Sequence, residues 1–221
     1  MTYDAEGKWL YDLIARRFFN LMADTELIKK FLSGDVNAFN TLVWRWEKSV
    51  YNFILRYMGD REESQDICQK TFIRVYRKLN LLRDTEKFST WLYQIAINIC
   101  RDEIKSRSRR KTYSLDHLQE NGNGVQSGLL NLTTDSKSEP EEQAHKRDVS
   151  DLMGRALRTL PEEQRVVIIM KEYQGLKFTE IADILETSVN TAKSRMYYGI
   201  AALRKIFKRW EISKESLRYE M

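Results

Sequence analysis

Apolar residues recur every three or four positions along most of the chain, which is the pattern of amphipathic helices. The pattern runs over residues 24–111, with Gly34 and Gly59 as predicted helix stops, and it resumes near His145 and continues to residue 210. Few segments alternate as strands do, and the 221 residues include only two prolines and nine glycines. We therefore predict an all-α protein of two small helical domains joined by a flexible acidic linker.

The segment between the two blocks lacks sustained periodicity. It is polar, and residues 112–148 carry seven acidic and three basic side chains, a composition typical of flexible linkers. The predicted units are listed in chain order: an N-terminal extension (1–22), a first helical domain (23–111), the linker (112–147), a second helical domain (148–210) and a tail (211–221).

The first block contains a stripe of inward positions, Ile67, Thr71, Val75 and Leu79, followed by a polar loop over residues 83–90. In the second block, Pro161 followed by two glutamates predicts a helix start. A short helix over residues 178–185, the turn "ETS" and a longer basic helix from Ser188, the expected N-cap, make a helix-turn-helix.

The longer helix, "SVNTAKSRMYYGIAALRK", has two distinct faces. Its core-facing stripe is Ala192, Met196, Gly199, Ile200 and Leu203, whereas its outer face combines short polar side chains, Tyr197 and Tyr198 with Lys193 and Arg195 on the shoulders. No acidic residue occurs from Val189 to Trp210. Taken alone, such a face is ordinarily a solvated one, but in a helix-turn-helix it is the face that enters the DNA major groove.

Charge distribution adds to this interpretation. The net charge is only +5, yet residues 101–111 hold six basic and two acidic residues, and residues 189–210 are purely basic. Two basic segments separated by an acidic one indicate two surfaces that face nucleic acid.

Composition also argues against a secreted protein, a membrane protein and an enzyme. Cys68 and Cys100 fit buried thiols of a reducing cytoplasm, and neither a signal peptide nor a membrane span is predicted. The two histidines lack partners at metal-ligand spacing, and no catalytic motif occurs, so we expect no metal, no cofactor and no enzyme. The expected location is the cytoplasm.

Two sequence blocks resemble a known family. "SQDICQKTFIRVYR" and "FSTWLYQIAINICRDEIKSRSRR" resemble region 2 of bacterial sigma factors, and "GLKFTEIADILETSVNTAKSRMYYGIAALRK" resembles region 4. Both blocks stand in the right order with no region-3 domain between them. The chain therefore resembles the extracytoplasmic-function (ECF) subfamily of the sigma-70 family over about residues 24–208.

The chain departs from the family pattern at four positions. Glu186 stands where the family usually has glycine, which tolerates a left-handed backbone. Thr187 replaces an aliphatic residue, Asn190 replaces glycine, and Tyr198 stands where arginine is frequent. The promoter sequence that better-known family members prefer therefore cannot be transferred to this chain.

The resemblance implies three sets of site residues. The helix over residues 64–77 would dock on core RNA polymerase through Asp66, Gln69, Lys70, Ile73 and Arg74. The loop and following helix would bind and melt the −10 element, with Asp84, Lys87, Phe88, Trp91, Asn98, Arg101 and Lys105 as candidates. The −35 element would be bound by Asn190, Thr191, Lys193, Ser194, Arg195, Tyr197 and Tyr198.

Some of these assignments have alternatives. Trp91 lies in register with Ile95 and Ile99 and is equally suited to the core, and Asn98 can either bind DNA or buttress the fold. Phe88, Trp91 and Tyr93 are the aromatic side chains available for an unpaired base, whose extrusion costs a few kcal/mol. The basic residues of 101–111 would contact phosphates.

The resemblance predicts a sigma factor that binds core RNA polymerase and promoter DNA, with an anti-sigma factor as a further candidate partner. The main alternative is a stand-alone helix-turn-helix regulator, which has no use for a polymerase-binding helix or a −10 loop. An RNA-binding adaptor would explain the basic charge but not the helix-turn-helix.

Residues 1–22 precede the resemblance. Trp9, Leu10, Leu13, Ile14 and Phe18 fall at helical spacing and predict an amphipathic helix that docks on the first domain. The alternative is translation from Met22.

Overall fold

The computed structural model describes residues 22–117 and 151–210. In the N-terminal part, α2 (Asp24–Leu32), α3 (Val36–Met58), α4 (Arg61–Lys78) and α5 (Phe88–His117) follow one another, with short 3-10 turns at Leu79–Leu81 and Thr85–Lys87. In the C-terminal part, residues 151–158 are helical, and α7 (Glu162–Ile168), a π-helical turn (Ile169–Tyr173), α8 (Phe178–Ile184) and α9 (Val189–Arg209) follow. No strand occurs in these two ranges, so the predicted all-α fold is confirmed.

The N-terminal helices pack around a core rich in aromatic rings. Phe53 stacks on Tyr57 and meets Tyr93 edge-on, with ring centroids 6.2 and 5.3 Å apart. Trp46 lies edge-on to both Phe88 and Tyr93. Such edge-to-face pairs stabilise a core beyond the burial of their area.

Both predicted helix stops are confirmed. Gly34 and Gly59 have φ values of 108° and 82°, a left-handed backbone that ends α2 and α3 at little cost for glycine. The predicted stripe on α4, from Ile67 to Leu79, is buried, and so are the free thiols Cys68 and Cys100. Burial raises the pKa of the Cys68 thiol to about 12, so this thiol stays protonated near neutral pH.

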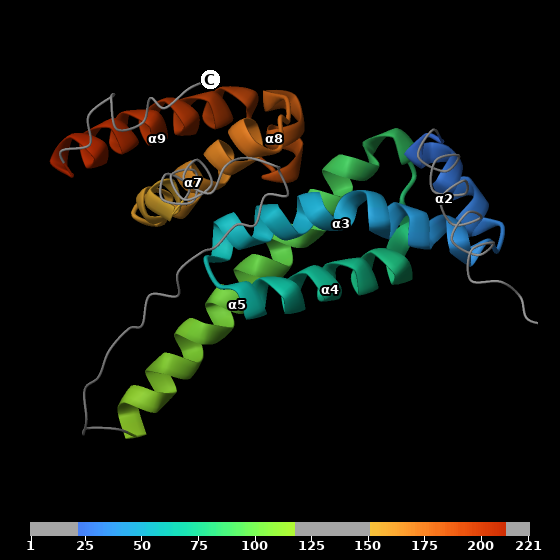
Figure 1. Cartoon of the computed structure of the whole chain (residues 1–221), viewed down its shortest axis with the longest axis horizontal. Coiled ribbons are helices and arrows are strands. Elements are labelled where there is room, and N and C mark those ends of the chain that lie inside the picture. Colours follow the sequence, from blue (N-terminus) through green and yellow to red (C-terminus); the bar gives the residue numbers. More distant parts are fainter. Residues whose placement is uncertain (1–21, 118–150, 211–221) are drawn as a thin grey trace, which may run out of the picture.

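The C-terminal helices form a smaller core of aliphatic side chains. α9 crosses α7 closely at Gly199, where an added Cβ would lie 2.7 Å from Cδ1 of Ile168. Figure 1 shows α7, α8 and α9 lying together along one side of α3, while the C-terminal half of α5 projects away from the other helices. The buried residues of both parts form one continuous hydrophobic cluster.

Two boundaries differ from the sequence prediction. The predicted loop over residues 83–90 is shorter, because Asp84 accepts a hydrogen bond from the backbone N–H of Glu86 and α5 begins at Phe88. α5 also continues to His117, past the expected boundary at residue 111. The predicted N-terminal helix and the linker from residue 118 onwards lie outside the described residues.

Among the described residues, no helix combines the length and the apolar character that a membrane span needs.

Candidate promoter and polymerase interfaces

The last helix of the helix-turn-helix, α9, begins as the sequence predicts. Ser188 has an extended backbone, and its hydroxyl accepts a hydrogen bond from the backbone N–H of Thr191 at 3.0 Å. The hydroxyl groups of Ser188 and Thr191 also lie 2.8 Å apart. This N-cap fixes the start of α9, whose first turns form one face of the molecule.

The two faces of α9 separate as expected. Ala192, Met196, Gly199 and Leu203 are buried, and Ile200 is half-buried against the core. Tyr197 and Tyr198 are 71 % and 61 % exposed, and their rings meet edge-on. The exposed neighbours on this face are Asn190, Lys193 and Ser194, with Thr191 half-buried. The result is an uncovered cationic and aromatic surface, which we call the α9 face.

Arg195 is placed differently from the rest of its predicted group. It is half-buried and lines a cleft of about 460 Å³ between the N- and C-terminal parts, together with Arg101, Lys105 and Glu162. In this arrangement Arg195 faces the N-terminal domain instead of extending the α9 face.

The turn before α9 has a strained backbone. Glu186 is the one residue other than glycine with a positive φ (51°) within the described ranges, the conformation for which the family uses glycine. The Glu186 carboxylate accepts a hydrogen bond from Nε2 of Gln94, on α5, at 2.9 Å. The residue that makes the turn unfavourable therefore also ties it to the N-terminal part.

The predicted polymerase-binding residues share the exposed side of α4. Asp66, Gln69, Lys70, Ile73 and Arg74 are all exposed, and Ile73 is 45 % accessible despite its apolar side chain. Beside them, an open groove of about 1060 Å³ runs between α3 and α4. Its lining is largely apolar and includes Phe39, Phe72 and Tyr76, the last of which is 48 % exposed. We call the exposed side of α4 with this groove the α4 face.

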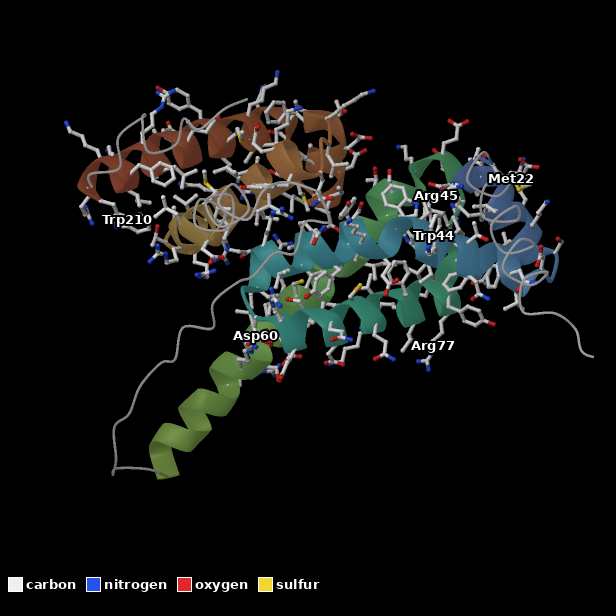
Figure 2. All side chains as sticks on the ribbon, viewed as in Figure 1. Met22, Trp44, Arg45, Asp60, Arg77 and Trp210 are labelled. Atoms are coloured by element: carbon white, nitrogen blue, oxygen red, sulfur yellow. The ribbon has the colours of Figure 1, made fainter. Side chains whose placement is uncertain are left out.

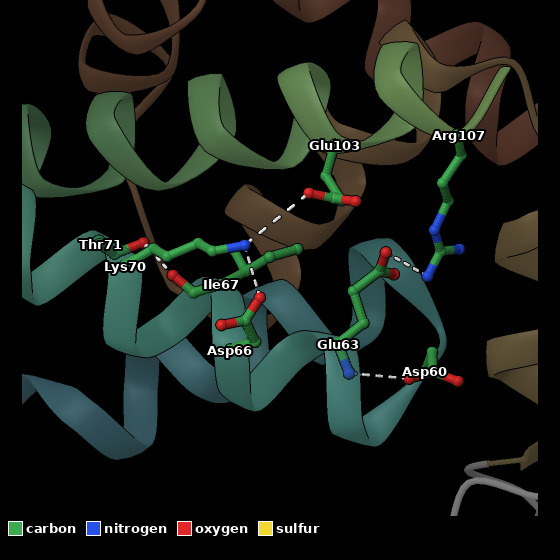
Figure 3. A network of polar contacts seen from close by, with 8 residues as sticks. All are labelled: Asp60, Glu63, Asp66, Ile67, Lys70, Thr71, Glu103 and Arg107. Carbon is green, nitrogen blue, oxygen red and sulfur yellow. Dashed lines mark hydrogen bonds and ion pairs between the residues drawn. The ribbon is translucent and has the colours of Figure 1, made fainter. Parts of the chain in front are cut away.

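Figure 3 shows how the polar part of the α4 face is held. Lys70 pairs with Asp66 one turn earlier, at 2.5 Å, and lies 4.0 Å from Glu103 on α5. The hydrogen bond from Lys70 to Asp66 raises the pKa of Lys70. Further along, Arg107 forms an ion pair with Glu63, near the N-cap Asp60. Exposed pairs such as Lys70 with Asp66 stabilise the fold little, so they can be exchanged for a partner.

The predicted −10 residues fall into two groups. Asp84, Lys87, Asn98 and Lys105 are exposed. Phe88, by contrast, is 1 % exposed and packs against Trp46, and Tyr93 is 2 % exposed. These two rings serve the core in this structure, because a ring that is enclosed on both faces cannot stack on a base. Trp91 is half-buried beside Phe88, with a centroid separation of 6.4 Å, so it retains one accessible side.

Arg101, the remaining −10 candidate, is already paired. Its Nε donates to Oε1 of Glu162 at 3.0 Å, and the same oxygen accepts the hydroxyl of Tyr57 at 2.8 Å. Burial alone would raise the pKa of Glu162, but the hydrogen bonds from Tyr57 and Arg101 outweigh it and hold the pKa below its ordinary value. Burial raises the pKa of Tyr57, and the bond to Glu162 adds to that shift.

Sequence reasoning missed several of these residues. Tyr76 and Arg77 line the groove (Arg77 is labelled in Figure 2), and their spacing from Ile73 on α4 was the signal that would have included them. The contacts of Tyr57 with Glu162 gave no such signal, because the two residues lie 105 positions apart.

One helical part with a half-apolar groove beside α4 and one helix-turn-helix part with an uncovered outer face are the features of a two-part, DNA-binding transcription factor. The Sigma-70 region 2 family matches residues 42–110, and the Sigma-70, region 4 family matches residues 150–203. The RNA polymerase sigma-H factor of Pseudomonas aeruginosa is 30 % identical over 182 residues, which is 82 % of this chain and 92 % of that protein. The ECF RNA polymerase sigma-E factor of Escherichia coli K12 is 32 % identical over 182 residues, covering 82 % and 93 %.

The chain therefore belongs to the ECF group of the sigma-70 family and is a sigma factor. We refer to its described parts as region 2 (residues 22–117) and region 4 (residues 151–210). The stand-alone regulator is not favoured, since both regions are present in order.

Solved structures share the fold. CnrH, solved in complex with the cytosolic domain of CnrY, superimposes with a TM-score of 0.61 at 21 % identity, covering 85 % of this chain and 99 % of that one. The sigma factor RpoE of Bartonella quintana, solved with the anti-sigma factor NepR, gives a TM-score of 0.62 at 18 % identity, covering 78 % and 98 %. At these identities the likeness concerns the fold.

Proposed function

We propose that the α9 face reads the −35 element of a promoter. The observation that carries this assignment is the exposure of Lys193, Tyr197 and Tyr198 on the helix that follows the turn, above a buried stripe that fixes its orientation. A reading helix places its first turns at base edges. There the tyrosine rings would pack on sugar or a thymine methyl, Lys193 would bind phosphate or a base edge, and Asn190 and Thr191 would hold a phosphate near the helix start.

Region 2 carries the second DNA contact in this proposal. The accessible group is Asp84, Lys87, Asn98 and Lys105, with Trp91 offering one side of its ring to an unpaired base of the −10 element. Phe88 is left out of the contact set because of its burial.

The α4 face is our candidate for docking on core RNA polymerase. An exposed isoleucine beside a groove lined by aromatic rings is suited to a partner helix, and Gln69, Arg74 and Arg77 provide polar contacts at its edge. CnrH and the Bartonella quintana protein were solved with their regulatory partners, and we propose an anti-sigma factor as a partner of this chain too. RNA synthesis itself belongs to the polymerase, and the site of action is the cytoplasm.

Transcription with purified core polymerase on a genomic template tests the function. Core enzyme plus this protein should initiate at defined sites, and core enzyme alone should not. If no defined start appears with the complete template, the proposal is wrong.

A matched pair of variants tests the α4 face within the same assay. Ile73→Ala should weaken core binding several-fold, because it removes an exposed apolar contact without touching the core of region 2. Leu81→Ala, which removes an exposed apolar side chain beyond α4 and outside the groove, is the control and should bind as the original protein does. Equal core affinities for the two variants would contradict the assignment of this face.

A further inference from the structure

The groove of the α4 face is an apolar surface that is open to solvent. Its walls include the rings of Phe39, Phe72 and Tyr76 and the side chain of Ile73. Phe39 and Phe72 are largely buried, whereas Tyr76 and Ile73 are exposed at the rim. Large apolar side chains that are gathered in one open groove ordinarily mark a place where another chain segment binds.

The length of this groove suits one short helix. Its two walls are residues 39–51 of α3 and residues 65–77 of α4. At 1.5 Å per residue, each wall is about 18 Å long, which is the length of roughly three helical turns. A helix of that length, laid between two others, is the usual way in which an amphipathic segment fills an apolar groove.

The N-terminal extension contains a segment of matching length and pattern. Residues 1–21 lie outside the described residues, but their sequence predicts an amphipathic helix whose apolar positions are Trp9, Leu10, Leu13, Ile14 and Phe18. From position 9 to position 18 such a helix rises about 14 Å. A helix this short is marginal in water alone, so it needs a surface to pack on.

The connection to region 2 allows the segment to reach the groove. The Met22 carbonyl accepts a hydrogen bond from Nη2 of Arg45, on α3, at 2.8 Å. α2 then carries Phe31 to one end of the groove, where its ring centroid lies 5.2 Å from that of Phe39. Phe31 stands about 11 Å along α2, and the four residue steps from Phe18 to Met22 cover up to about 14 Å.

The tether also favours this segment over other occupants. A segment held by a few residues has an effective concentration on the order of millimolar at its site. A second copy of the chain, or a separate protein, has to bind the groove from solution. At equal intrinsic affinity, the tethered helix therefore occupies the groove first.

We propose that residues 9–18 dock as a helix in the groove of the α4 face and compete there with core RNA polymerase. The docking depends on the groove and the segment alone, whereas the competition rests on the proposed function of the α4 face. The N-terminal extension thereby lowers the affinity of region 2 for its partners without changing their contacts.

Thiol labelling of the 221-residue protein tests the docking without polymerase. Gln69→Cys places a reactive thiol at the edge of the groove and keeps its apolar walls. The native thiols of Cys68 and Cys100 should react slowly with a maleimide, because both are buried and burial raises their pKa. The new thiol should react on the order of tenfold more slowly in the full chain than in a chain that begins at Met22.

A matched pair of charge insertions tests the predicted face of the segment. Leu13→Glu in the full chain should restore fast labelling, because it puts a charge on the apolar stripe. Ala15→Glu adds the same charge about 160° around the helix, away from the stripe, and should leave the thiol protected. Equal labelling with and without residues 1–21 would overturn the docking. Protection that grows with protein concentration would assign the groove to a second copy and would overturn it too.

Core polymerase affinity is measured separately on the proteins without the added thiol. The chain that begins at Met22 and Leu13→Glu should each bind core polymerase several-fold more tightly than the original protein, and Ala15→Glu should bind as the original does. Thiol protection without any change in core affinity would support the docking and contradict the polymerase assignment of the α4 face. The two failures are therefore distinguishable.

Discussion

The two surfaces assigned to promoter DNA differ in how far the free protein exposes them. The α9 face is uncovered, with both tyrosines more than half accessible. On region 2, the aromatic rings of Phe88 and Tyr93 are enclosed and Arg101 is paired with region 4. Under our proposal, region 4 therefore offers duplex DNA a preformed surface, whereas region 2 offers the −10 element only part of its predicted contact set.

The difference has a basis in packing. Region 4 builds its core from aliphatic side chains, which leaves the tyrosines of α9 free for the surface. Region 2 uses its aromatic rings internally, in edge-to-face contacts among α3 and α5. An aromatic side chain near a DNA-binding loop is therefore weak evidence for stacking when the same domain needs such rings in its core.

The largest effect is expected for Phe88→Ala. Because the ring is fully buried between Trp46 and Trp91, its loss should lower the free energy of unfolding by about 3–5 kcal/mol. Chemical denaturation measures the change. Tyr197→Ala, which removes an exposed ring, is the control and should change stability by no more than about 0.5 kcal/mol. If Phe88→Ala weakens DNA binding without destabilising the protein, Phe88 belongs to the DNA surface after all.

The next largest effect is expected for Gly199→Val, which tests the position of α9 on α7. The added side chain would meet Ile168 at a distance that no real Cβ contact allows, so we expect a loss of about 1–3 kcal/mol and weaker −35 binding. Arg204→Val, an exposed change on the same helix, controls for the lower helix propensity of valine. Equal thermal stabilities for the two variants would show that the crossing is looser than described.

The α9 face itself is tested by Lys193→Ala and Tyr198→Ala. Each should weaken binding of duplex DNA carrying the −35 element, and for Tyr198 the loss should be on the order of 1 kcal/mol. Both should bind core polymerase as the original protein does, since they lie on region 4 away from the α4 face. Loss of core polymerase binding by either variant would mean that the α9 face has been assigned wrongly to DNA.

The smallest effect is expected for Glu186→Gly. Glycine relieves the left-handed backbone, while the bond to Gln94 is lost, so the net stability change should stay within about 1 kcal/mol. Chemical denaturation measures the change. Gln94→Ala, which removes the same bond and leaves the backbone strained, should lower stability more than Glu186→Gly does.

How much the sequence predicted depends on the range of the contacts. The N-cap Ser188, the buried stripe from Ala192 to Leu203 and the stops at Gly34 and Gly59 are confirmed, because each depends on local periodicity or backbone geometry. The left-handed backbone at Glu186 agrees with the glycine that the family usually has there, so this feature came from the resemblance.

Contacts between the regions were beyond such reasoning. Glu162 was correctly predicted to lie in the first turn of a helix, and Arg101 in a basic segment, but no local pattern pairs residues 61 positions apart across a linker. The burial of Phe88 was missed because both the core and a DNA surface use aromatic residues. The assignment of the −10 and polymerase surfaces rested on family resemblance, and it remains a proposal.

Site-specific photo-crosslinking tests most directly the claim that both regions contact one promoter in the complex with core polymerase. A photoreactive residue replaces Lys87 in one preparation and Tyr198 in another, and each is irradiated in the complex with core polymerase and promoter DNA. We predict crosslinks near −10 from position 87 and near −35 from position 198, about 25 base pairs apart, and none from position 87 without polymerase. Crosslinks from both positions within a few base pairs, or the same region 2 crosslink from the free protein, would contradict the account.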